Sequence, residues 1–234
     1  MRKFVGMLAL AMALFMPRVA GAATITFMQF TEVNFNAPVT FTNDGSGNTT
    51  IVATNVLVDV GLNESFCLNV GCDGFDDTQD VVFNLNAGST GAATSVGGVV
   101  TQPYAGSFSF TQGGINLLTV TFSDELSGSE DGSNPGLNAS DPPDTFSGTS
   151  DVLDPDLLLA PRGFAFSFSA FTSAGEGGLV IVNQSVASGT ADISGTLNAS
   201  PLQVSEVPEP ASLLLMGSGL AAIASRVRRR RKSS

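Results

Sequence analysis

Hydrophobic and polar residues alternate along most of this chain with the two-residue period of β-strands. Phe164, Phe166 and Phe168 alternate with alanine and serine, so one face of that segment carries aromatic rings and the other carries small side chains. The same period recurs at residues 56–60, 108–110 and 118–122, and shorter apolar runs stand at 24–30, 33–41, 81–85, 179–186 and 191–197. This pattern predicts about nine or ten strands and no helix between residues 23 and 199.

Turn residues between these runs predict how the strands connect. Gly113 and Gly114 separate two alternating segments and predict a hairpin, because glycine accepts the positive φ of tight hairpin turns. Strands with one apolar and one polar face predict an all-β fold, an antiparallel β-sandwich that is jelly-roll-like or immunoglobulin-like. A β-solenoid is the alternative, and the lack of a fixed-period repeat disfavours it.

Both ends of the chain differ from this alternating body. Residues 1–22 have the layout of a secretory signal peptide, with Arg2 and Lys3 ahead of an apolar run at 4–16. Ala20 and Ala22 are the small residues that signal peptidase requires, so cleavage is expected after Ala22. The predicted body, residues 23–199, is therefore an exported domain.

The C-terminus combines three features within residues 207–232. Pro208, Glu209 and Pro210 precede an apolar stretch at 211–225, which as a helix would be about 22 Å long and would only marginally span the membrane. A basic cluster follows, and it would stay on the cytoplasmic side as a stop for translocation: Arg226, Arg228, Arg229, Arg230, Arg231 and Lys232. The pattern predicts a C-terminal transmembrane helix with the body outside the membrane.

This tripartite end resembles the PEP-CTERM sorting tail of Gram-negative bacteria. The resemblance covers residues 207–232 and implies that a membrane-embedded exosortase recognises Pro208, Glu209 and Pro210 and cuts near them. It further implies delivery to the cell surface or to the exopolysaccharide matrix, with the helix as a transient anchor. The alternative is an ordinary single-span anchor with positive charges inside.

Removing both terminal segments changes the charge of the chain. Nine of its ten basic residues lie in them, so residues 23–206 carry 20 acids against Arg162 alone, a formal charge of −19 compared with −11 for the whole chain. Nucleic-acid binding is excluded as a function, because neutralising phosphates requires lysine and arginine. Such a body is expected to take up cations and to depend on apolar packing for its stability.

Residues 123–161 carry nine acids and several prolines and glycines, so a long acidic loop is expected there, with 145–150 as a candidate edge strand. Residues 200–206 are expected to form a linker to the sorting tail.

Cys67 and Cys72 predict a local disulfide in an oxidising compartment, with a redox or metal-binding pair as the alternative.

Four carboxylates follow the cysteines closely and form a candidate calcium site: Asp73, Asp76, Asp77 and Asp80. Their spacing matches no known calcium loop, and solvated loops of an acidic exported protein are the alternative explanation. Other acids are comparable candidates: Asp124 with Glu125, Glu130 with Asp131, and Asp151 with Asp154 and Asp156. No cofactor other than calcium is indicated.

The chain contains no histidine, which excludes Ser-His-Asp and Cys-His catalysis, and it has no phosphate-binding glycine loop. Its only lysines lie in the terminal segments. The preferred function is therefore a non-catalytic structural or interaction protein of the cell surface or extracellular matrix, with exopolysaccharide or other matrix components as partners. The alternative is a secreted carbohydrate-binding module or a glycoside hydrolase that uses two carboxylates.

Overall fold

The computed structural model describes residues 24–34, 39–63, 80–132, 134–141, 143–153, 159–173 and 176–200. They form these strands: β1 (Ile25–Glu32), β2 (Val39–Asn43), β3 (Thr49–Leu62), β4 (Val81–Ser89), β5 (Thr94–Val96), β6 (Val99–Gln112), β7 (Ile115–Ser129), β8 (Gly136–Asp141), β9 (Thr145–Thr149), β10 (Leu159–Ser173), β11 (Glu176–Gly177), β12 (Ile181–Val182), β13 (Ser185–Val186) and β14 (Gly189–Ser200). These ranges contain no other regular element, which confirms the all-β prediction. Among the same residues, no helix has the length and apolar character that crossing a membrane requires.

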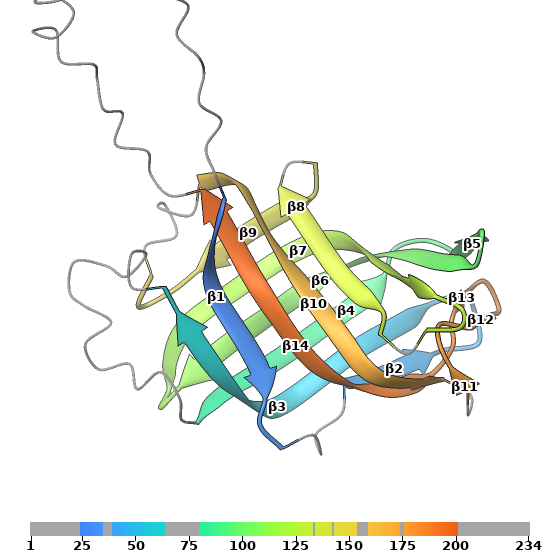
Figure 1. Cartoon of the computed structure of the whole chain (residues 1–234), viewed down its shortest axis with the longest axis horizontal. Coiled ribbons are helices and arrows are strands. Elements are labelled where there is room, and N and C mark those ends of the chain that lie inside the picture. The colour runs from blue at the N-terminus through green and yellow to red at the C-terminus, as the bar shows by residue number, and fades with distance from the viewer. Residues whose placement is uncertain are drawn as a thin grey trace, which may run out of the picture. The chain divides into compact units, whose positions relative to one another are not determined.

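The main sheet closes on itself as a barrel (Figure 1). Around the ring the order is β1, β3, β4, β6, β7, β8, β10 and β14, each neighbouring pair is antiparallel, and β14 pairs with β1 to complete the circuit. β2 also lies between β3 and β14, and β9 pairs with the part of β7 that β8 does not reach. The predicted sandwich is therefore wrong, because alternating faces are common to sandwiches and barrels and only the pairing partners decide between them.

Phenylalanine side chains fill the interior of the barrel. The rings of Phe164 and Phe166 have centroids 4.4 Å apart, and Phe108 lies 5.1 Å from the first and 4.9 Å from the second. Phe30 reaches the same cluster through an edge-to-face contact of 5.4 Å with Phe166. Burying each ring stabilises the fold by roughly 1.5–3 kcal/mol. This cluster therefore provides the apolar packing on which the acidic body was expected to depend for its stability.

Two glycines allow the strands to approach one another closely. A Cβ on Gly106 would lie 2.2 Å from the carbonyl oxygen of Asn86, and one on Gly195 would lie 2.5 Å from the Phe166 ring and 2.7 Å from that of Phe30. Larger residues at either position would force the backbone or the aromatic core to move. The hairpin predicted at Gly113 and Gly114 is also observed, and both residues have positive φ between β6 and β7.

A buried polar network fastens the small β12–β13 hairpin to the barrel. Gln102 donates to the Ser185 hydroxyl at 2.7 Å and accepts from the Val186 amide at 3.0 Å, while the Tyr104 hydroxyl donates to Gln102 at 3.1 Å. Thr49 on β3 shares a 2.7 Å hydrogen bond with Ser185. The segment 179–186, expected to be one strand, is instead this hairpin, and its polar groups are satisfied inside the fold.

Residues 123–161 differ from the expected acidic loop. They contain the end of β7, all of β8 and β9, and the start of β10, and β9 occupies the segment predicted as an edge strand. Buried Leu126, Leu137 and Phe146 alternate there with exposed or half-buried polar residues. Because so many residues of this segment are acidic, its two-residue alternation of buried and exposed positions was hard to recognise in the sequence.

Candidate functional site

Several residues singled out by the sequence lie outside the described residues. They are the cleavage residues Ala20 and Ala22, the cysteines Cys67 and Cys72, Asp73, Asp76 and Asp77, and the sorting tail from Pro208 to Lys232. Asp80, the last acid of the candidate calcium site, is exposed directly before β4 and has a positive φ of 65°. Among the residues that the structure describes, no three acidic or sulfur ligands come together to hold a metal ion. The calcium site stays a prediction.

The candidate acids of the described segments have separate local roles. The Asp151 carboxylate accepts the Asn116 amide at 2.9 Å and so ties the chain after β9 to the start of β7. Glu130 accepts a hydrogen bond from the Ser95 hydroxyl at the hairpin of β5 and β6. Asp154 and Asp156 lie outside the described residues.

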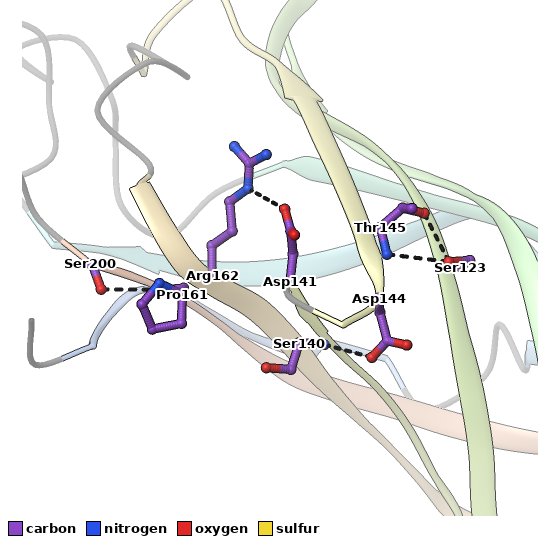
Figure 2. Close-up of polar contacts among 8 residues, drawn as sticks. All are labelled: Ser123, Ser140, Asp141, Asp144, Thr145, Pro161, Arg162 and Ser200. Atoms are coloured by element: carbon purple, nitrogen blue, oxygen red, sulfur yellow. Dashed lines mark hydrogen bonds and ion pairs between the residues drawn. The ribbon is translucent and has the colours of Figure 1, made fainter. Parts of the chain in front are cut away.

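Arg162, the one basic residue of the body, lies where β8 and β10 pair (Figure 2). Its Nε donates to Asp141 Oδ2 at 3.0 Å, and its guanidinium carbon lies 5.5 Å from the centre of the Phe146 ring. Nearby, Asp144 accepts the Ser140 amide at 3.1 Å and closes the turn between β8 and β9. Both partners of the ion pair are half-buried, and the contact joins β10 to β8 at paired positions of the two strands.

Asp124 is the most unusual acid of the structure. It points into the barrel from β7, is only 6% exposed, and has one oxygen, Oδ2, that is fully buried and has no partner among the described residues. Its other oxygen accepts the Glu125 amide. Burial raises the pKa of Asp124 to about 8 against the lowering effect of that hydrogen bond, and the charges of Asp144 and Glu125 act in the same direction as burial.

The carboxyl of Asp124 is therefore mostly neutral at pH 7 and inaccessible to any substrate. Its inward direction could have been read from the sequence, because it lies two residues from Phe122 and two from Leu126, both buried. The interpretation of Asp124 and Glu125 as candidate calcium ligands of a loop did not use this alternation.

A groove of about 670 Å³ lies on the outer wall over β3, β1, β14 and β10. Strand register places its outward side chains in two parallel rows. The first row runs Gly61, Gln29, Thr196, Ala165, and the second runs Asp59, Thr31, Ser194, Ser167. We call these eight residues the outer groove.

The polar groups of the outer groove are not used by the fold. In the described part of the chain, none of its side chains forms a hydrogen bond with another protein group: Gln29, Thr31, Asp59, Ser167, Ser194 and Thr196. A smaller hollow of about 340 Å³ over β3, β4, β6 and β7 differs, because there Asn84 accepts the Asn55 amide at 2.9 Å and Thr119 donates to Asn116 at 2.9 Å. The outer groove is the candidate binding site.

Sequence reasoning missed the outer groove. Its residues come from four segments that are far apart in the chain, and each segment contributes only small or polar residues at ordinary outward positions. The alternation identifies them as outward, but only the register of β1 against both β3 and β14 brings them together.

The fold and site define an antiparallel barrel with a filled interior, whose accessible polar chemistry lies on its outer wall. Comparison with protein families adds that the model of the PEP-CTERM protein-sorting motif matches residues 206–231. This match confirms the resemblance of the C-terminus: the chain carries a PEP-CTERM protein-sorting motif there. The motif implies export, a membrane-anchored C-terminal sorting signal and exosortase processing. No curated protein and no solved structure matches the chain.

Proposed function

We propose that this chain is delivered to the cell surface or extracellular matrix of a Gram-negative bacterium, where its barrel acts as a structural or interaction module. The observation that carries this proposal is the sorting motif at residues 206–231. In that role signal peptidase cuts after Ala22, and exosortase acts near Pro208, Glu209 and Pro210. What remains is an acidic barrel without its terminal apolar segments.

A non-catalytic role is supported by the distribution of the carboxylates. Hydrolysis of a glycoside by two acids requires both beside the same sugar bond. The outer groove has Asp59 as its one carboxylate among the described lining residues, and Asp124 is sealed inside the barrel. The groove therefore supports a carbohydrate-binding module as the alternative function, and it does not support a glycoside hydrolase.

The test is to express the full chain in a bacterium that carries an exosortase, fractionate the culture and determine both ends of the protein by mass spectrometry. We expect an N-terminus at Ala23 and a new C-terminus near Pro208, with the protein in the surface or matrix fraction. A variant with alanine at Pro208, Glu209 and Pro210 is the control and should keep Ser234. Wild-type protein that also ends at Ser234 in the membrane fraction would refute the proposal.

A further inference from the structure

We propose that the outer groove binds a neutral, hydroxyl-rich polymer, an internal stretch of an uncharged polysaccharide. This inference rests on the proposed surface or matrix function and names the class of partner for it. Three features of the outer groove support this partner: the spacing of its two rows, the chemistry of their side chains and the negative charge of the body around them.

The geometry is that of an extended ligand site. Neighbouring strands lie about 4.8 Å apart and outward residues of one strand about 7 Å apart, so the two rows cover roughly 14 Å by 7 Å. The Gln29 side chain lies across Gly61, with its Cγ and Nε2 both 3.4 Å from where a glycine Cβ would be. At the other end of that row, Ala165 is exposed and short, which leaves the groove open for a chain to pass through.

The chemistry matches sugar hydroxyls, which both donate and accept hydrogen bonds. Thr31, Ser194 and Thr196 supply hydroxyls that do the same, Gln29 adds an amide, and Asp59 adds an acceptor. Because these groups have no partner within the described protein, a ligand does not have to break internal hydrogen bonds to reach them.

Other partner classes fit less well. The outer groove has no basic residue, and the body of charge −19 around it repels phosphate-rich and uronic-acid polymers. A single carboxylate is too few ligands for a calcium ion. A lipid or apolar peptide would need an exposed apolar floor, whereas the apolar lining residues Phe30 and Val60 are buried and Leu62 is half-buried. A second barrel would bring another strongly negative surface against this one.

The site has no aromatic platform, because phenylalanines line the interior and Tyr104, the single tyrosine, is buried. Sugar binding would therefore depend on hydrogen bonds and on repeated contacts along a polymer. We expect weak affinity for short oligosaccharides and stronger retention on the intact polymer.

The experiment uses the full chain in a polyoxyethylene detergent, which has no sugar headgroup. Neutral gluco- and manno-oligosaccharides, and the corresponding polymers, are titrated while amide signals are followed by NMR. Shifts should be concentrated at Gly61 and Gly195, whose glycine amides lie in the groove wall and occupy a distinctive spectral region.

The matched variants separate binding from folding. Replacing Gln29 by Met and Thr31 and Thr196 by Val removes hydrogen-bonding groups with little change in shape, and should weaken binding about tenfold or more. The control replaces exposed Thr40 and Thr121, outside the groove, by Val and should bind as the parent does. Ala165→Leu, which obstructs the open end without removing a polar group, should also weaken binding.

The proposal is refuted if no neutral glycan shifts the groove amides, or if the groove variants bind as tightly as the control. Stronger binding of anionic polymers or self-association through this wall would also refute it. None of these results affects the processing of the chain at its two ends, so the proposed delivery to the surface can stand without this partner.

Discussion

Replacing Asp124 by Asn should stabilise the barrel at neutral pH. In the unfolded chain this carboxyl has its ordinary pKa of 3.8, whereas the pKa in the barrel is about 8. Between these values the unfolded chain is ionised and the folded chain keeps its proton. The folded state is therefore penalised as the pH rises from about 4 to about 8, and the penalty is constant above that.

Keeping the Asp124 carboxyl protonated in the folded state costs about 1.4 kcal/mol of folding free energy for each pH unit above its ordinary pKa. At pH 7 this gives an upper limit of about 4 kcal/mol, and relaxation of the protein around the buried carboxyl reduces it to about 2–3 kcal/mol. Asn keeps an acceptor for the Glu125 amide but buries an extra N–H, which costs about 1 kcal/mol. The net effect expected for Asp124→Asn is a gain of about 1–2 kcal/mol at pH 7 and a loss of about 1 kcal/mol at pH 4, where only the cost of the extra N–H remains.

Urea unfolding of the full chain in detergent, at pH values from 4 to 8.5, measures this difference. Tyr104 is a suitable probe, because the chain has one tyrosine and no tryptophan, and it lies opposite Asp124 in the β6–β7 register. Asp192→Asn on β14 controls for the change in net charge and should shift stability by less than about 0.5 kcal/mol. Parallel pH profiles for the parent and Asp124→Asn would refute the assignment of Asp124 as a buried, protonated carboxyl.

Three further predictions test other parts of the structure. Gly195→Ala should destabilise the barrel by about 1–3 kcal/mol, because its methyl group would overlap the Phe166 and Phe30 rings, and thermal unfolding beside Thr196→Val measures this. Arg162→Lys, which alters the contact with Asp141, should cost no more than about 1 kcal/mol and less in 1 M salt, as urea unfolding in low and high salt would show. Calorimetric titration of the full chain with calcium should release or absorb heat and raise the melting temperature if the carboxylates of residues 73–80 bind it; no heat and no change would remove that site.

The strands were largely predictable because their signal is local. The alternation at Phe164, Phe166 and Phe168 gave both the strand and its buried face, and Gly113 with Gly114 gave the hairpin between β6 and β7. Each of these inferences needs only neighbouring residues and the two-residue period of a strand.

Closure of the barrel and the composition of the outer groove could not be predicted in the same way. Both depend on which strand pairs with β1, and the apolar face of β1 would suit a sandwich equally well. In the acidic segment, the density of carboxylates, prolines and glycines predicts a loop, although buried Leu126 and Phe146 continue the alternation there. The sorting motif was recognisable because it is a contiguous pattern at a fixed place in the chain.

The pairing of the first described strand with the last has a consequence for the timing of folding. A chain exported from its N-terminus presents β1 early, but β1 acquires its β14 partner only after residues up to Ala199 have crossed the membrane. Until then its edge is unpaired on that side, and contacts of such long sequence separation form slowly. The apolar stretch at 211–225 begins twelve residues after Ala199, so under the proposed processing a tail that first holds the chain at the membrane would give β1 and β14 time to pair before the chain is released.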